Sequence, residues 1–351
     1  MKTQDALKLF TPRRIAIPIV IGLGAAGYML YSNFDAQALK KVEITGTFIF
    51  FIFLAFIMML IRDLAYMYRI RVLTDQQLSW RKSFDVIMLW EFASAITPSV
   101  VGGSGVALFI LNKEGINLGR STAVVMVTAF LDELFYIIMV PLVLLAVGVN
   151  NLFPVELQKE IFGITLGTKE IFIAGYVFIL FLTITIIYAV FISPIRFKKA
   201  LFSVFKMRIL KKWRLAAVRT SNDLIITSAE LKEKPLSFWA KAFGSTLFSW
   251  TARFWVVNFI ILAFASASFQ EHLLIYARQL VMWVIMLISP TPGSSGVAEF
   301  AFSGFLREFT PAGLSEALAL LWRFISYYPY LFIGAIVLPR WVKRVFPTNT
   351  H

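Results

Sequence analysis

The residues most able to do chemistry in this sequence are charged side chains that lie inside long apolar stretches. Four of them are Asp132, Glu133, Arg253 and Arg323. An ionised side chain at the centre of a membrane costs about 2.5–3.5 kcal/mol on insertion scales, so each one needs a partner or water. We therefore take these four residues as candidates for a polar groove inside a membrane protein.

Two clusters rich in proline, glycine and serine interrupt further apolar stretches. One includes Pro98, Gly102, Gly103, Ser104 and Gly105, and the other includes Pro292, Gly293, Ser294, Ser295 and Gly296. Broken backbone in hydrocarbon is tolerated only inside protein or beside a water-filled cavity, and freed helix N-termini can bind an anionic headgroup. We expect the glycines to allow close backbone approach at a substrate site. Proline and glycine that merely kink ordinary helices are the alternative.

Asp132 and Arg323 occupy equivalent places after the two clusters. The interval from Gly105 to Asp132 is 27 residues, and so is the interval from Gly296 to Arg323. We hypothesise that the two side chains approach each other as a gate or as headgroup contacts, although an ion pair that only orients helices is the alternative. Tyr327 follows Arg323 in a stretch of hydroxyls and aromatics that either lines a cavity or packs between helices.

Glu91 and Glu299 flank the two clusters. A carboxylate there could contact a cationic headgroup or a coupling ion, or it could simply be hydrated near the end of a helix. The sequence has no cysteine, and its two histidines, His272 and His351, are far apart. Thiol chemistry, a metal site, a catalytic residue set and a cofactor are therefore not expected.

The composition places these residues in a membrane protein. Of the 351 residues 59% are hydrophobic and 15% are charged, whereas soluble domains are about half apolar and a quarter charged. Six stretches are long enough to cross a core of about 30 Å as helices. They are residues 15–31, 44–61, 121–149, 171–195, 238–264 and 313–339.

The basic residues predict the orientation of these spans. The net charge of +14 lies in short segments between apolar stretches, which is typical of loops retained in the cytoplasm and not of nucleic-acid binding. We place both termini in the cytoplasm, together with the segment after residue 61 that carries Arg62, Arg69 and Arg71. The basic linker 196–237 is also cytoplasmic, where it either binds anionic lipid or only reflects this charge bias.

This orientation requires residues 83–112 and 273–312 to form re-entrant hairpins from opposite faces. The predicted fold is an all-α integral membrane protein, a single domain over residues 1–351, with two repeats at 44–149 and 238–339. Inverted repeats with discontinuous helices are typical of secondary transporters, whose substrate site lies near the middle of the membrane.

The two clusters, with Glu299 and the stretch from Arg323 to Pro329, resemble the flippase-like membrane region of lysylphosphatidylglycerol synthases. The resemblance covers most of the chain. It implies a protein that moves an amphipathic lipid between leaflets, such as a phospholipid, an aminoacylated lipid or a glycolipid. Where the family has a Glu-Arg pair followed by Asp, this sequence has Leu131-Asp132-Glu133. Lysyl transfer is not expected, because the soluble synthase domain is not in this sequence.

The leading functional hypothesis is a flippase or lipid transporter, not an enzyme, in the inner cell membrane. A membrane enzyme that transfers a group to or from a lipid carrier, with Asp132 or Glu133 as its base, is one alternative. A non-enzymatic partner of a separate lipid synthase is another. Fold-level analogy alone does not choose among them.

Overall fold

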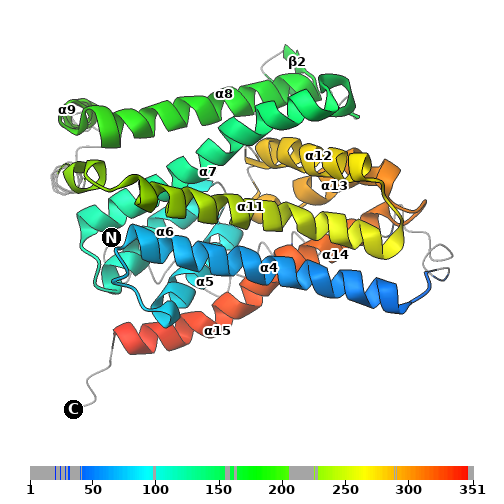
Figure 1. Ribbon diagram of the computed structural model, residues 1–351, viewed down its shortest axis with the longest axis horizontal. Helices are drawn as coiled ribbons and strands as arrows, with labels where there is room; N and C mark the ends of the chain where they lie inside the picture. The colour runs from blue at the N-terminus through cyan, green and yellow to red at the C-terminus, as the bar shows by residue number, and fades with distance from the viewer. Residues whose placement is uncertain are drawn as a thin grey trace.

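The chain folds almost entirely into helices, most of which run along the long axis of the molecule (Figure 1). In this computed structural model the described residues are 42–97, 100–154, 159–161, 164–204, 228–287, 289 and 291–346, with a few isolated positions elsewhere. The predicted span 15–31, most of the basic linker and Pro98 lie outside the described residues. The predicted all-helical membrane class is confirmed by what is described.

Five helical segments are long and apolar enough to cross a membrane. They are α4 (Gly46–Leu73), α7 (Leu118–Val147), α8 (Thr168–Ile187) with the π-helical turn η3 (Tyr188–Ile192), α11 (Leu236–Phe264), and α14 (Ser315–Ser326) followed by α15 (Tyr328–Val345). Each of them covers one of the predicted spans from 44–61 onwards.

Helix α4 is longer than the predicted span 44–61. Its buried residues recur every three or four positions through Ala55, Met59, Arg62, Tyr66 and Arg69, so one face stays in contact with the protein well beyond residue 61. Arg62 is 1% exposed and Arg69 is 4% exposed. Both arginines therefore lie on the interior face of a helix and not in a loop, whereas their predicted cytoplasmic side stays a prediction.

Both proline- and glycine-rich clusters separate two helices. At the first, α5 (Trp80–Ile96) ends just before the cluster, and Gly102, Gly103, Ser104 and Gly105 lie in the first turns of α6 (Val100–Lys113). The second, which contains η5 (Pro292–Ser294), lies between α12 (Phe269–Leu287) and α13 (Val297–Leu306). Figure 1 shows α5 and α6 in the left half of the molecule and α12 and α13 in the right half. The two broken pairs therefore lie toward opposite ends.

Local sequence explains where several of these helices begin. The side chains of Thr45, Ser79 and Asn117 each accept a hydrogen bond from the backbone N–H three residues later, at the starts of α4, α5 and α7. Short polar side chains are favoured at this position because they satisfy N–H groups that have no partner within the helix.

The packing of the first half has a counterpart in the second half. α4 and α11 run antiparallel and contact each other extensively at the front of the bundle in Figure 1. α4 packs on α5 as α11 packs on α12, α6 packs on α7 as α13 packs on α14, and α5 contacts α15 as α12 contacts α7. The helices on either side of the two breaks therefore occupy matching environments.

The predicted span 313–339 is two helices and not one. α14 ends at Ser326, Tyr327 leaves the helical conformation with φ −129° and ψ −55°, and α15 begins at Tyr328. Pro329 lies in the first turn of α15, where proline is tolerated because its missing N–H would have no helical partner. The chain thus has a third helix break, at Tyr327, in addition to those at the two clusters.

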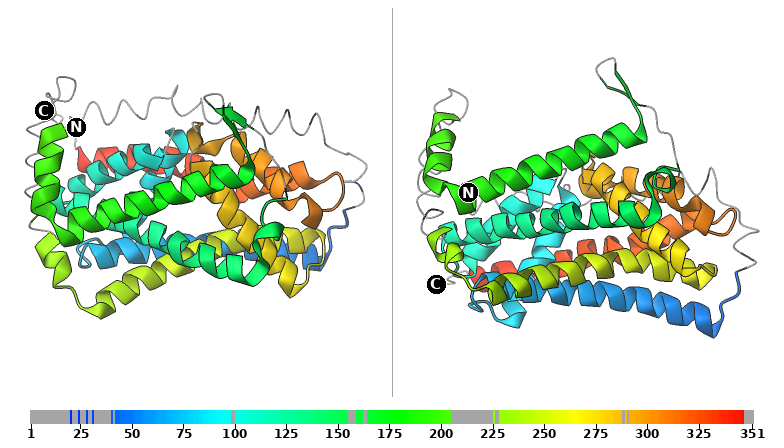
Figure 2. Two further views of the ribbon diagram at one scale, coloured as in Figure 1. Left: turned by 90° about the horizontal axis from the view of Figure 1, so that it is seen from above. Right: turned by 45° about the horizontal axis from the view of Figure 1, so that its top comes forward.

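The remaining elements are short. They are η2 (Val149–Asn151), the antiparallel strands β1 (Lys159–Ile161) and β2 (Ile164–Leu166), α9 (Pro194–Val204) and η6 (Arg307–Phe309). Figure 2 shows α8 along one side of the bundle and α9 turned across its end.

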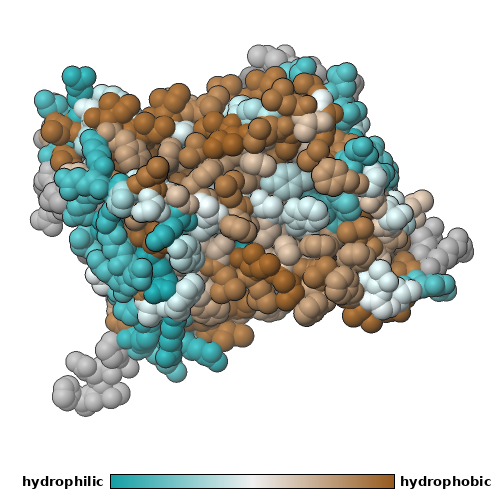
Figure 3. All heavy atoms as spheres, viewed as in Figure 1, coloured by the Kyte–Doolittle hydropathy of each residue, from teal (hydrophilic) through white to brown (hydrophobic). Residues whose placement is uncertain are grey.

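The surface is apolar along the helices and hydrophilic at the ends. In Figure 3 brown residues cover most of the middle of the visible face, whereas teal residues gather mainly at the left end. Large side chains such as Leu145, Phe181 and Phe332 are among the exposed residues. A bilayer can satisfy such a surface, which in water would favour association.

Candidate functional site

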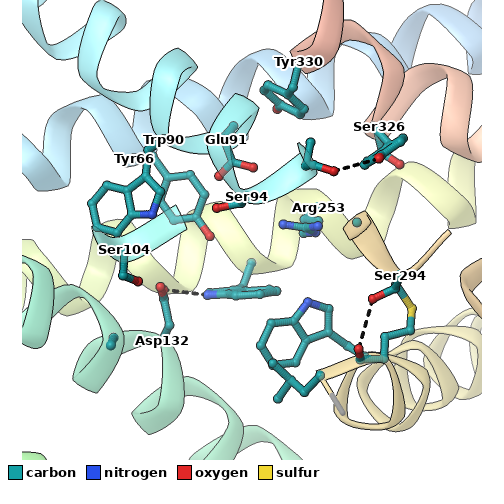
Figure 4. Close-up of a pocket in the computed structure, with 18 of the residues that line it drawn as sticks. Tyr66, Trp90, Glu91, Ser94, Ser104, Asp132, Arg253, Ser294, Ser326 and Tyr330 are labelled. Atoms are coloured by element: carbon teal, nitrogen blue, oxygen red, sulfur yellow. Dashed lines mark hydrogen bonds between the residues drawn. The ribbon is translucent and has the colours of Figure 1, made fainter. Parts of the chain in front are cut away.

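A cavity of about 730 Å³ lies where the helix breaks meet the long helices. Its wall takes residues from α4, α5, α6, α7, α8, α11, α12, α14 and α15 (Figure 4). Ligand pockets are usually about 300–1,000 Å³, so this volume suits a lipid headgroup or a molecule of similar size. The wall is unusual for a membrane interior because it is charged as well as aromatic.

Most of the predicted groove residues belong to this wall. Those that line it are Glu91, Asp132, Glu133, Arg253, Arg323 and Tyr327. Glu299 is 1% exposed and lies behind the wall, where it contacts Arg323. Of the predicted cluster residues, Ser104, Gly293 and Ser294 line the cavity.

Asp132 is held by a cation and an indole. Arg69 Nη1 lies 2.5 Å from Asp132 Oδ1 and also donates to Thr246 Oγ1 at 2.9 Å. The indole N–H of Trp250 donates to Asp132 Oδ1 at 2.8 Å, as the dashed line in Figure 4 shows. These contacts tie α4, α7 and α11 together and compensate the charge of Asp132 with an arginine that the sequence analysis placed elsewhere.

Glu91 is held by Arg62 at a distance of 2.6 Å. Arg62 also contacts Asp63 at 2.7 Å and donates to the hydroxyl of Tyr330 at 2.6 Å, and that hydroxyl donates to Asp63 at 2.8 Å. The guanidinium lies 4.4 Å from the ring centroid of Tyr66. Buried arginine is stable only with such partners, and here they fasten α4 to α5 and α15.

Arg323 is held at the second break. Its Nε lies 3.0 Å from Glu299 Oε1, its Nη2 donates to the carbonyl of Gly293 at 2.9 Å, and its guanidinium stacks 3.6 Å above the ring of Tyr327. Glu299 also accepts a hydrogen bond from the N–H of Gly296 at 2.7 Å. A carboxylate in the first turn of α13 stabilises the start of that helix, so the pair orders the break.

Tyr327 connects the two halves of the chain. Its hydroxyl donates to the carbonyl of Ala95, near the end of α5, at 3.0 Å. Its ring packs so closely on Gly293 that a Cβ built there would lie 2.3 Å from Tyr327 Cε2. The side chain therefore spans from the second break to the helix that leads into the first.

Packing within the protein requires glycine at some positions of the two clusters and not at others, whereas their predicted close approach to a substrate stays a prediction. A Cβ on Gly103 would lie 2.0 Å from Ser94 Oγ, so Gly103 and Gly293 both need a hydrogen side chain. A Cβ built on Gly105 has nothing within 4 Å, so no protein atom requires glycine there. Gly296 has φ 85°, a conformation that favours glycine.

Glu133 and Arg253 differ from the charges described so far. Glu133 accepts a hydrogen bond from Thr183 Oγ1 of α8 at 2.8 Å, and Arg253 lies 5.3 Å from the ring centroid of Trp250. Within the described ranges, neither of them forms an ion pair. They are the two charged groups in the wall whose charge no neighbouring side chain compensates.

Asp132 and Arg323 do not form an ion pair with each other, and their role as a gate or as headgroup contacts stays a prediction. Asp132 pairs with Arg69, and Arg323 pairs with Glu299. Equivalent positions in two related halves contact each other only if they lie on the axis between the halves. Here each of the two residues instead pairs with an oppositely charged residue of its own half. Both remain in the wall of one cavity.

Sequence reasoning missed several wall and supporting residues. Arg69, Tyr66 and Trp250 line the cavity, and Arg62 lies directly behind it. The available signal was the spacing of Arg62, Tyr66 and Arg69, which places them on one helical face together with Met59. A count of positive charge does not separate such buried arginines from loop arginines.

The charged wall of the cavity is suited to binding a polar group. Among the described residues, no group of three or more His, Cys, Asp or Glu side chains could hold a metal ion. Glu91 and Asp132 are each bonded to an arginine. The wall encloses a charged space among apolar helices.

Comparisons with known proteins agree with this picture. The sequence profile of the family described as the lysylphosphatidylglycerol synthase TM region matches residues 15–334. A UPF0104 membrane protein of Archaeoglobus fulgidus is 27% identical over 267 residues, which cover 74% of this chain and 76% of that protein.

Proposed function

The chain belongs to the lysylphosphatidylglycerol synthase TM-region family of membrane proteins, and from this premise we propose that it moves an amphipathic lipid between the two leaflets of a membrane. The headgroup passes through the cavity of about 730 Å³ while the acyl chains stay in the bilayer. The observation that carries this proposal is a charged cavity bounded by two helix breaks among five apolar helices.

The energetics of a headgroup in a membrane favour such a route. Moving a polar or charged group into hydrocarbon without a partner costs several kcal/mol or more. Side chains of the wall, such as Asp132, Glu133 and Arg253, together with the polar residues next to the breaks, can replace water around that group. The apolar outer surface of the helices leaves the acyl chains in contact with lipid.

The matched packing of the two halves supports a further element of the proposal, namely that the chain contains two inverted repeats. We take α4 to α7 and α11 to α15 as inverted repeats, with the pairs α5–α6 and α12–α13 as re-entrant hairpins from opposite faces. Substrate sites of transporters with inverted repeats lie between the repeats at discontinuous helices, which is where the cavity is found. The hydrophilic left end of Figure 3 would then face the cytoplasm of a cell with this protein in its inner membrane.

We also propose that the chain is not itself an enzyme. The relevant alternative is a group transfer with Glu133 as the base, since its carboxylate is bonded to Thr183 and not to a cation. A separate lipid synthase as a partner is compatible with lipid movement, and the basic linker is where we would look for its contact.

The test is lipid movement in proteoliposomes, using two alanines exchanged for cysteine in a chain that has none of its own. Ala129 lies in the cavity wall, whereas Ala174 is exposed on α8 and outside the wall. Each variant is labelled completely with N-phenylmaleimide in detergent, checked by mass spectrometry, and reconstituted with fluorescent phospholipids. The label at Ala129→Cys should block movement between leaflets, and the label at Ala174→Cys should leave it unchanged.

Equal rates for both labelled variants would remove the cavity from the transport path. Failure of the unlabelled, folded protein to move any lipid would refute the flippase proposal itself. Turnover of a lipid donor by the purified protein would favour the enzyme instead.

A further inference from the structure

Arg253 is the cation of the cavity that has no carboxylate beside it. It lies in the middle of α11, lines the cavity and stacks near the ring of Trp250 at 5.3 Å. The other arginines at or behind the wall, Arg62, Arg69 and Arg323, each form an ion pair at 3.0 Å or less. In the described part of the chain Arg253 has neither an ion pair nor a hydrogen bond to a side chain. Figure 4 shows it among the side chains that line the cavity, with no dashed line to it.

The register of the two halves identifies Arg62 as the counterpart of Arg253. The interval from Arg62 to Gly105 is 43 residues, and so is the interval from Arg253 to Gly296. α4 and α11, which carry these arginines, are an antiparallel pair that pack along each other. The two arginines therefore occupy matching positions on matching helices.

The partners of Arg62 have been replaced around Arg253. The counterpart of Asp63 is Phe254. The counterpart of Glu91 is Met282 or, with the one-residue offset between the two breaks, Trp283. All of these replacements line the cavity. The first half therefore compensates the charge of Arg62 with two carboxylates. The second half instead places apolar and aromatic side chains at the matching positions around Arg253.

A guanidinium in such surroundings favours an anionic ligand. It has five N–H donors and no acceptor, and its planar fork matches the oxygens of a phosphate. The ring of Trp250 is oriented by its hydrogen bond to Asp132, and stacking on an aromatic face holds a guanidinium while its N–H groups stay free. The geometry thus presents a fixed cation to the space through which the headgroup moves.

We propose that Arg253 binds the phosphate of the headgroup and makes the cavity selective for phosphate-bearing lipids over neutral ones. The inference rests on the proposed function, since it names the substrate class of the same cavity. Arg62 has the matching place in the fold but a structural role, because Asp63 and Glu91 already occupy its donors.

The experiment measures binding and not transport. Full-length protein in detergent is titrated with short-chain phosphatidylglycerol, with diacylglycerol of the same chain length, and with soluble glycerol phosphate, and tryptophan fluorescence reports on the ligand because Trp250 lies beside Arg253. The variants are Arg253→Gln, Arg253→Lys and, as a matched control, Arg340→Gln, whose arginine is exposed on α15 and outside the cavity wall.

The native protein should bind phosphatidylglycerol more tightly than diacylglycerol. Arg253→Gln should weaken phosphatidylglycerol binding about 10- to 100-fold, as expected for loss of a charged hydrogen-bond donor, with diacylglycerol unchanged. Arg253→Lys should recover part of the loss, and Arg340→Gln should behave as native. Competition by glycerol phosphate would identify a soluble phosphate compound as the ligand, and its failure would identify the lipid.

If Arg253→Gln, folded as judged by gel filtration, binds both lipids as the native protein does, then water and not a phosphate satisfies Arg253 and the inference is overturned. That result leaves the flippase proposal standing if the native protein moves lipid. Conversely, phosphate-dependent binding lost in Arg253→Gln, in a native protein that moves no lipid, would uphold the inference and refute the flippase.

Discussion

Replacing Gly293 with alanine tests whether the second helix break is held by the contact between Gly293 and Tyr327. The new Cβ would lie 2.3 Å from Tyr327 Cε2 and 2.5 Å from its hydroxyl oxygen, whereas ordinary contacts begin near 3.4 Å. The ring must therefore move by about 1 Å. It is not free to do so, because its hydroxyl is bonded to Ala95 and its face carries the guanidinium of Arg323.

The cost follows from three contributions. Alanine at φ 56° costs about 1–2 kcal/mol, overpacking about 1–3 kcal/mol, and loss of the hydroxyl bond to Ala95 about 1 kcal/mol. The expected destabilisation by Gly293→Ala is therefore about 3–6 kcal/mol in total. The conformation alone does not exclude a side chain, since the neighbouring Ser294 has φ 54° without being glycine.

The assay is equilibrium unfolding in mixed micelles with increasing sodium dodecyl sulfate, followed by tryptophan fluorescence. Gly105→Ala is the matched control at the other break, because nothing lies within 4 Å of a Cβ there. It should be neutral or stabilising by up to about 1 kcal/mol, as for alanine in a helix interior. In Gly293→Ala/Tyr327→Ala the clash is gone, so the double variant should lose less than the sum of the two single losses. A Gly293→Ala protein within about 1 kcal/mol of native would refute the reasoning.

Three further outcomes are expected. Arg69→Met should lower the free energy of unfolding by about 3 kcal/mol because it leaves Asp132 without its cation. Arg69→Met/Asp132→Leu should regain most of that free energy, and a double variant as unstable as Arg69→Met would argue against the pair. Gly334→Ala should lower the unfolding midpoint, since its Cβ would lie 2.3 Å from Phe92 Cγ and overpacking costs about 1–3 kcal/mol. An unchanged midpoint would mean that α5 and α15 are not in close contact. Glu114→Gln should lower the melting temperature in detergent, because the buried carboxylate accepts from the indole of Trp341 and from Arg344, and no shift would show that these bonds contribute little.

Much of the fold could be predicted because apolar length and helix-breaking residues act locally. Five predicted spans correspond to long apolar helices, and both clusters around Gly103 and Gly293 do interrupt a helix. The end of α4 could not be predicted from charge, because Arg62 and Arg69 are basic residues that an interior face accommodates with Glu91 and Asp132. Interior partners are a tertiary property that hydropathy does not contain.

The candidate site could be predicted as a set of residues but not as a set of contacts. Asp132, Arg253 and Arg323 were recognisable because ionised groups inside apolar stretches are costly, and all three line one cavity. Which charges pair depends on helix rotation, and repeat symmetry pointed to Arg323 where the structure has Arg69 beside Asp132. The break at Tyr327 was also missed, because the stretch around it is apolar enough for a single span.

The length of α4 sets how the protein relates to the thickness of its bilayer. At 1.5 Å per residue its 28 residues extend about 42 Å, which exceeds a hydrocarbon core of about 30 Å by about 12 Å. The helix must therefore tilt or project, and a thinner bilayer increases that hydrophobic mismatch. Arg62 lies about 24 Å from the start of α4 and about 17 Å from its end. If the excess of about 12 Å projects at the C-terminal end, Arg62 lies about 5 Å inside the core, whereas tilting keeps it deeper. Lipid chain length therefore sets how far Arg62 lies from the aqueous boundary, where salt would screen its charge.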